Sequence, residues 1–247
     1  HRHIADFLAE EVLRQQPSRV AAFLLQVSVL DRMCGSLCNA LTGRDDGHAL
    51  LRELARSDLF VTGLDERQEW YRFHHLFGEF LRTRLDEKGD QDGRSLHDRA
   101  SRWFEAEGYG EEAVAHALRA GDDRRAADLI ERNWRTLDRR HQSGTWRRWA
   151  EALPRDVLEA RPVLTMGYGW ALLDAGEIDD GEVFLDRTES RLNAPSQEMV
   201  VADEAEFAAL PGTLAAARAY VAQARGDLAA TERHAREALE LIPEDDH

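Results

Sequence analysis

The first 88 residues alternate between helical and strand-like hydrophobic patterns. Apolar residues recur at helical spacing in five stretches, which run from Ile4 to Val12, Val20 to Val27, Leu37 to Leu41, Leu50 to Leu54 and Leu76 to Leu85. Between the last two stretches, "DLFVTGL" and "EWYRF" are rich in β-formers, and the polar run "DERQ" separates them. Helices, a hairpin and a closing helix in this order predict a winged-helix module over residues 1–88.

The pattern changes after this module. Residues 86–94, "DEKGDQDGR", are polar and contain glycine, so they predict a loop or linker. Beyond them the hydrophobic spacing is helical only. We therefore expect a mainly α protein with two domains: a winged-helix module with one small β-hairpin over 1–88, and a helical-repeat domain over 89–247.

The helical part contains a weak internal repeat. Three segments share a helix, a Gly followed by an acid, and a second helix: residues 116–130, 170–185 and 220–235. Gly121, Gly176 and Gly226 supply the left-handed turn that ends a helix. The last unit, residues 213–246, resembles a tetratricopeptide repeat in length and in its small residues. The wider spacing of the earlier units predicts longer helices or an additional helix, and the whole predicts an α-solenoid.

Charge separates the two parts of the chain. The net charge is −15, with 12 basic and 14 acidic residues in 1–88 and 20 and 33 in 89–247. This balance disfavours sequence-independent binding to nucleic acid, which needs a basic face.

No apolar run is long enough for a transmembrane helix. Two cysteines predict no disulfide framework, so the expected compartment is the cytoplasm. The chain begins "HRHIADFL" without Met, so we expect it to be a piece of a longer protein.

A winged helix can place its third helix in the major groove of DNA. Here that helix, over residues 47–58, offers Arg52 and Arg56 but also Glu53 and Asp58. The hairpin tip is net acidic. These charges favour a packing or regulatory role for the module over direct DNA binding.

No catalytic or metal-binding constellation stands out. There is no Gly-rich phosphate loop, nucleophile elbow or HExxH motif, so we expect no enzyme activity. Cys34 and Cys38 are four residues apart but have no further ligands nearby, which favours burial over zinc binding. Asp179, Asp180 and Glu182 form the densest acidic patch, and there a helix-capping role is favoured over cation binding.

One aromatic pair is a candidate for ligand binding. Trp146 and Trp149 fall on one helical face in "TWRRWAEALP", beside Arg147. Such a face could line a groove for a small molecule or peptide. Packing between helix layers is the favoured alternative for these residues, as for most aromatics of the repeats.

Residues 23–47, 50–85 and 96–131 together resemble a known family. They look like the middle of the MalT-like group of large ATP-binding LuxR-type transcriptional regulators, of the STAND class. The most specific string is "WYRFHHLFGEFLRTRL", residues 70–85. The resemblance implies a winged helix that follows an ATPase domain, then a helical-repeat sensor, with DNA bound by a separate C-terminal domain.

The resemblance also implies a mechanism. STAND proteins switch between an ADP-bound resting state and an ATP-bound oligomerising state, with Mg²⁺ accompanying the nucleotide in the full-length protein. A small-molecule inducer or regulatory protein on the repeats would bias this switch through unequal affinity for the two states. Partners would thus be the inducer and the ATPase domain of the same chain, and no membrane.

Within this family pattern, Phe73-His74-His75 is similar to the Met-His-Asp motif of the STAND winged helix. His74 occupies the position that contacts nucleotide phosphate, whereas His75 replaces the acid and is expected to pack or cap. Two rival hypotheses remain beside a regulatory role: an autonomous repeat scaffold that binds a protein partner, and a winged-helix DNA binder.

Overall fold

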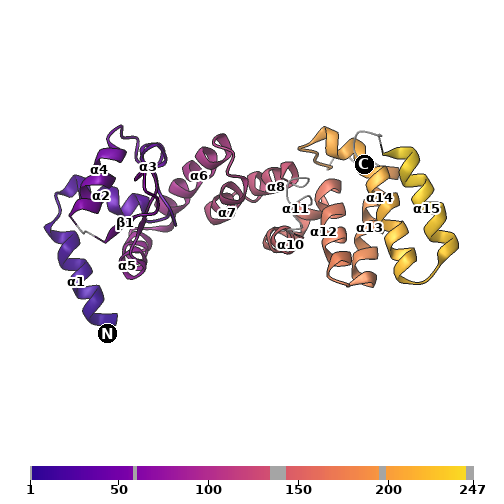
Figure 1. The fold of residues 1–247 in the computed structure, drawn as a ribbon, viewed down its shortest axis with the longest axis horizontal. Coiled ribbons are helices and arrows are strands. Elements are labelled where there is room, and N and C mark those ends of the chain that lie inside the picture. The colour runs from indigo at the N-terminus through magenta and orange to yellow at the C-terminus, as the bar shows by residue number, and fades with distance from the viewer. Residues whose placement is uncertain (1, 58–59, 134–142, 195–198, 243–247) are drawn as a thin grey trace. The chain divides into compact units, whose positions relative to one another are not determined.

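The structure is a computed structural model that describes residues 2–57, 60–133, 143–194 and 199–242 (Figure 1). The side chains of residues 2–8, 90 and 143 lie outside this description, so the expected core positions Ile4, Phe7 and Leu8 do too. Residues 1–122 and 123–247 form two compact units. The chain is mainly helical with one small sheet, which confirms the expected fold class. The expected domain boundary at residue 88, with a winged-helix module before it and a sensor domain after it, stays a prediction.

The first unit begins with the elements of the winged helix, in the indigo and purple part of Figure 1. They are α1 (Arg2–Gln15), α2 (Ser18–Val27), α3 (Gly35–Thr42), α4 (Gly47–Arg56), β1 (Val61–Gly63), β2 (Tyr71–Phe73) and α5 (His75–Asp86). Each apolar stretch found in the sequence falls on one of the helices. Their fully buried side chains form the core of the module: Phe23, Leu24, Leu37, Leu51, Tyr71, Phe77 and Leu81.

The two strands of the hairpin pair antiparallel, and a third segment lies beside them. Val61 faces Phe73 and Gly63 faces Tyr71 across the two strands. Met33 exchanges two backbone hydrogen bonds with Tyr71, at 2.9 and 2.8 Å, and so extends the sheet by one bridge. The buried phenol ring of Tyr71 then anchors the sheet on the helices.

Two glycines allow α3 and α4 to cross in close contact. A Cβ on Gly35 would lie 2.6 Å from the Cβ of His48, and one on Gly47 would lie 2.8 Å from the carbonyl oxygen of Gly35. Asn39 accepts a hydrogen bond from the Gly47 backbone N–H at 2.8 Å. Any larger residue at Gly35 or Gly47 would therefore push the helices apart.

The linker expected at residues 86–94 is shorter than the sequence suggested. Helix α5 ends at Asp86 and α6 (Asp90–Ala106) begins almost at once, with Gly89 in a positive-φ conformation between them. Acidic residues favour the first turn of a helix, which explains why this polar run is helical. Helix α7 (Gly110–Ala120) packs on α6 and completes the first unit.

The second unit consists of helices only in its described residues. They are α8 (Asp123–Arg132), α10 (Ser143–Ala152), α11 (Arg155–Glu159), α12 (Pro162–Asp174), α13 (Ile178–Asn193), α14 (Glu204–Ala224) and α15 (Leu228–Leu241). Helices α12 and α13 form one packed pair, and α14 and α15 form another. Trp134 lies outside the described residues.

The glycine turns of the repeat are confirmed. Gly121, Gly176 and Gly226 all have φ between 73° and 81° and follow the ends of α7, α12 and α14. The next helix of the last pair is capped by Asp227, whose side chain accepts the N–H of Ala230. The short helices α10 and α11 account for the wider spacing of the earlier unit.

The last unit differs from a 34-residue tetratricopeptide repeat. Helix α14 begins at Glu204, nine residues before the repeat expected from the sequence, because Asp203 caps its N-terminus by accepting the N–H groups of Ala205 and Glu206. Pro211 lies inside this longer helix. This long helix packs on α12 and α13 through one apolar cluster. The cluster contains Val163, Met166, Leu173, Leu185, Leu210, Leu214, Ala217 and Val221.

Across the described part of the chain, no helix is both long and apolar enough to cross a bilayer.

Candidate functional site

His74 lies at the junction between β2 and α5. Its backbone N–H donates to the carbonyl oxygen of Phe60 at 2.6 Å, and its own carbonyl accepts the N–H of Gly78 at 2.9 Å, the first bond of the helix. The imidazole is exposed and contacts the Phe60 ring edge-on, with 6.4 Å between ring centroids. Phe60 is fixed in turn by stacking on Phe77. The strand-to-helix turn therefore presents His74 to solvent on a rigid support.

His75 does not have the role expected of it. It is the first residue of α5, its side chain is 76% exposed, and its Nε2 lies 3.3 Å from Glu79. It therefore neither packs in the core nor caps the helix, because His74 occupies the N-cap. Spacing alone could not decide this, since either histidine could have ended the strand.

A cation–π cluster joins the hairpin to α6 and α7 within the first unit. The guanidinium of Arg32 lies over the rings of Trp70 and Tyr109, at 4.4 and 4.9 Å from their centroids. Trp103 stacks on Tyr109, and Glu112 of α7 pairs with Arg32. No sequence pattern indicates this cluster, because Arg32 and Trp70 are distant in the chain from each other and from Tyr109.

The helix considered for DNA binding, residues 47–58 in the sequence, is α4. Its Arg52 and Arg56 are exposed, and so is the acidic Glu53 beside them. Leu50, Leu51 and Leu54 are buried, as the helical pattern predicted.

The described residues contain no group of three or more His, Cys, Asp or Glu arranged to hold a metal. Cys38 is fully buried, whereas Cys34 is the half-buried N-cap of α3.

In the second unit, the three candidate residues of α10 are placed differently from one another. Trp146 is fully buried and packs in the core, so its ring does not line a groove. Trp149 is half-buried. Arg147 donates to Glu177 at 2.6 Å and to Glu151 at 2.8 Å, and these hydrogen bonds raise the pKa of its guanidinium. A ligand-binding role for this helix stays a prediction.

A pocket of about 420 Å³ opens beside α10. Its lining combines aromatic, charged and aliphatic side chains from α10 to α13: Glu151, Glu159, Tyr168, Val183, Phe184 and Arg187. Tyr168 meets Phe184 edge-to-face at 4.8 Å between ring centroids, and Arg187 lies 4.7 Å over the Phe184 ring. Burial, and then the neighbouring Glu151 carboxylate, raise the pKa of Tyr168.

Charges on the rim of this pocket are held by ion pairs. Glu159 accepts hydrogen bonds from Arg155 at 2.7 Å and from Arg187 at 3.0 Å, and these arginines lower its pKa. The Tyr168 hydroxyl donates to Glu151 at 3.3 Å. The pocket thus offers apolar ring surface together with fixed hydrogen-bonding groups, the combination typical of small-molecule sites.

Comparison with known proteins identifies the first part of the chain. Residues 9–93 match the family model of the MalT winged helix domain. They form a MalT winged helix domain.

The similarity to MalT extends beyond this domain. The chain is 35% identical to the HTH-type transcriptional regulator MalT of Yersinia enterocolitica over 244 residues, which are 98% of this chain and 26% of that protein. The corresponding protein of Yersinia pestis is 34% identical over the same length. The chain is also similar to the serine/threonine-protein kinase PknK of Mycobacterium tuberculosis, with 39% identity over 68% of this chain and 15% of the kinase. It is therefore MalT-like in both units and spans about a quarter of the length of the MalT relatives.

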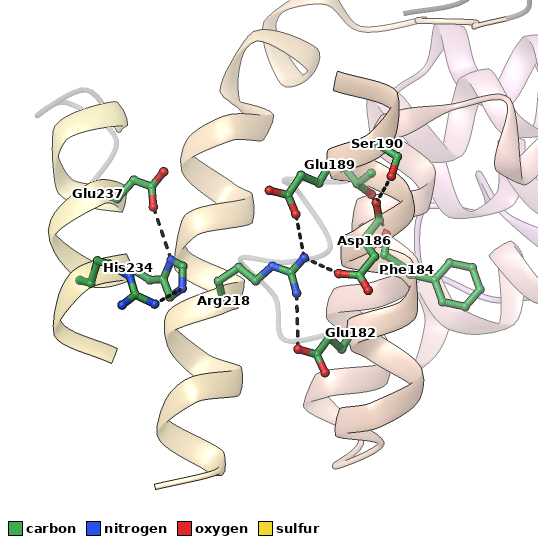
Figure 2. Close-up of polar contacts among 10 residues, drawn as sticks. Glu182, Phe184, Asp186, Glu189, Ser190, Arg218, His234 and Glu237 are labelled. Carbon is green, nitrogen blue, oxygen red and sulfur yellow. Dashed lines mark hydrogen bonds and ion pairs between the residues drawn. The ribbon is translucent and has the colours of Figure 1, made fainter. Parts of the chain in front are cut away.

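Arg218 of α14 and Arg225 at the C-cap of α14 pair with carboxylates of α13, two of which, Asp179 and Glu182, belong to the acidic patch. Arg218 lies among three carboxylates of α13 (Figure 2). Its guanidinium is 2.5 Å from Asp186, 2.9 Å from Glu189 and 3.5 Å from Glu182. Arg225 pairs with Asp179 at 2.8 Å and with Glu182 at 2.7 Å. The network ties α13 to α14 through their charged faces.

The capping role expected of the patch is wrong, because Glu177 is the N-cap of α13. Asp179 and Asp180 lie in the first turn instead, where their negative charge still suits the helix dipole. Asp179 and Glu182 have arginine partners that lie 46 and 43 residues further along the chain. Sequence spacing on one helix could not reveal these partners.

A buried ion pair lies at the centre of the second unit. Glu131 of α8 and Arg161 at the start of α12 are 0% and 4% exposed, with 3.2 Å between Oε2 and Nη1. The other oxygen of Glu131 accepts the backbone N–H groups of Ala202 and Asp203 at 2.8 and 3.1 Å. Burial raises the pKa of Glu131, although these hydrogen bonds and Arg161 oppose the shift. One carboxylate thus joins α8, α12 and the segment that leads into α14.

Proposed function

We propose that this chain is the regulatory and effector-sensing part of a MalT-like, ATP-dependent transcriptional activator. The observation that carries the proposal is similarity to MalT over both the winged helix and the helical repeats. In this proposal the chain has no catalytic role and works in the cytoplasm. ATP or ADP with Mg²⁺, and DNA, are bound by other domains of the whole protein.

His74 is the residue proposed to read the nucleotide. Its exposed imidazole lies at the N-terminus of α5, where the helix dipole and free N–H groups favour an anion. A donor at this point can bond a nucleotide phosphate presented by an adjoining ATPase domain. The resting ADP state would then be stabilised by a contact that an effector must outweigh.

The pocket beside α10 is the proposed effector site. Its volume falls within the usual range for small ligands, and Phe184 and Tyr168 offer ring surface while Glu151 and Arg187 offer polar contacts. Trp149 and Arg147 lie on the same helix as Glu151. A small-molecule inducer that contacts α10 and α13 together would fix the angle between these helices, and a regulatory protein could use the same surface.

A thermal-shift screen of a metabolite library against the 247-residue chain tests the effector site. A true effector raises the melting temperature, and its contribution to stability grows with the logarithm of its concentration, reaching about 2.7 kcal/mol at a hundred times its Kd. Phe184→Ala should abolish most of this stabilisation, because the ring forms part of the pocket wall. Tyr220→Ala is the matched control, since Tyr220 is an exposed aromatic outside the lining. Ligands that stabilise both variants equally would exclude the pocket as the effector site.

A further inference from the structure

A second groove, of about 450 Å³, lies inside the first unit. It is bounded by the end of α2, by α5 and by α6 and α7, so the winged helix contributes one wall and the first helix pair contributes the other. Its charged and titratable lining consists of Asp31, Arg82, Asp86, Arg94, His97 and Arg119. Three arginines and two carboxylates therefore line one cavity, although the chain as a whole has a net charge of −15.

Two of these arginines converge on a single carboxylate. Arg82 is anchored by the carbonyl oxygens of Ser28 and Leu30, at 2.8 and 3.3 Å, and its Nη2 lies 3.0 Å from Asp31. The Nη1 of Arg119 lies 3.6 Å from the other oxygen of Asp31. The Asp31 side chain is 70% exposed, so little holds it there besides these two cations.

The groove also contains one face of a buried histidine pair. His97 and His116 share a hydrogen bond of 2.8 Å between their Nδ1 atoms, and His116 stacks on Phe104. Burial, and then the charge of Arg119, lower the pKa of His97 to about 4, while Asp31 opposes this shift. Burial and His97 lower the pKa of His116 to about 3. Both rings are therefore neutral at pH 7, and the arginines dominate the electrostatic field at His97.

We propose that this groove binds a small anionic metabolite, whose phosphate or carboxylate group lies between Arg119 and Arg82 in place of the Asp31 carboxylate. Guanidinium groups suit this chemistry because they give paired, charge-assisted hydrogen bonds to planar or tetrahedral oxyanions. The cavity is large enough for a metabolite and lies within the usual range for ligand sites.

Binding would have a defined structural consequence. An anion between Arg82 of α5 and Arg119 of α7 links the winged helix to the first helix pair, with Arg94 of α6 on the same wall. It would also favour protonation of His97, since the added negative charge lies beside the ring. Neither effect depends on the role of His74 or on the pocket beside α10.

The test is a titration of the 247-residue chain with two probes, sulfate and citrate, followed by the NMR signals of the histidine rings. Sulfate stands for a phosphate group and keeps its charge between pH 5 and 8, whereas citrate tests carboxylates. Ionic strength is held constant with sodium chloride, because non-specific attraction is screened by salt. We expect a saturable shift of the His97 signal with at least one probe, and the stronger probe identifies the source of the oxyanion.

Two variants should change the affinity for the anion in opposite directions. Arg119→Gln should weaken binding about 10-fold by removing one charged donor, and Asp31→Asn should strengthen it by removing the competing carboxylate. Arg102→Gln is the control, because Arg102 lies on α6 but pairs with Asp98 outside the groove. Sulfate affinity should also increase as the pH falls from 6 towards 4, the pKa of His97 in the free protein, since a bound anion raises that pKa.

Three results would overturn the proposal. The first is the absence of a saturable His97 shift with both probes at matched ionic strength. The second is equal weakening by Arg119→Gln and Arg102→Gln, which would show general charge attraction rather than a site. The third is unchanged affinity in Asp31→Asn together with unchanged affinity in Arg119→Gln.

Discussion

Replacing Arg161 by Leu tests whether the buried ion pair holds the second unit together. The variant leaves the Glu131 carboxylate fully buried, with the N–H groups of Ala202 and Asp203 as its hydrogen-bond donors but without its cation. Removing one partner of a buried pair costs about 3–5 kcal/mol, because a buried charge is left uncompensated. We expect a loss of this size in the free energy of unfolding of the second unit at pH 7.5.

The loss should depend on pH in a defined direction. Burial raises the pKa of Glu131 in the folded protein above its unfolded value, and removal of Arg161 raises it further. A group with a raised folded pKa stabilises the native state as pH falls, because the folded protein then binds more protons than the unfolded chain. The cost of Arg161→Leu should therefore shrink between pH 7.5 and pH 5 as Glu131 takes up a proton.

Native-state hydrogen exchange measures this effect in the second unit alone. Protected amides of α12 and α14 report its unfolding, and the amides of Ala202 and Asp203 report local opening around Glu131. Arg155→Leu is the matched control, because Arg155 pairs with Glu159 at the surface, where ion pairs contribute little. A cost below about 1 kcal/mol, or a cost that is equal at pH 7.5 and pH 5, would show that the buried ion pair does not hold the second unit together.

Two further substitutions and one labelling experiment test the packing of the winged helix. Gly47→Ala should destabilise the first unit by about 1–3 kcal/mol, because the new Cβ would overlap the Gly35 carbonyl, and urea unfolding measures it. Gly93→Ala, at a helical position with no atom within 4 Å of the added Cβ, should instead stabilise by about 0.5–1 kcal/mol, and destabilisation there would show that the site lacks this free space. Burial raises the pKa of the Cys38 thiol, so iodoacetamide at pH 8 should label Cys34 first, and equal labelling rates would show that α3 opens easily.

Much of the winged helix could be predicted from the sequence because its signals are local. Apolar spacing located the helices, and the β-rich runs on either side of "DERQ" located the hairpin. Gly121, Gly176 and Gly226 marked the ends of helices, since only glycine adopts a positive φ at low cost. Residues 86–94 were misassigned because polarity and glycine suggest a loop, whereas the acidic residues suit the first turn of α6.

The contacts that define the candidate sites could not be predicted in the same way. The carboxylate partners of Arg218 lie 29 to 36 residues away from it, and those of Arg32 and Arg161 are also distant in the chain. Helical periodicity states which residues share a face, but not which face of another helix they meet. Trp146 and Trp149 illustrate this limit, because they share a helix and yet one is in the core and the other is half exposed.

The proposed switch depends most directly on His74, and the ADP content of the whole protein tests it. His74→Ala and His75→Ala variants of the whole protein are purified in parallel, and bound ADP is measured by chromatography after denaturation. We expect a loss of ADP and raised basal transcription for His74→Ala alone, because only His74 occupies the N-cap of α5, where phosphate would lie. An ADP content equal to that of the wild type in the His74→Ala protein would contradict it.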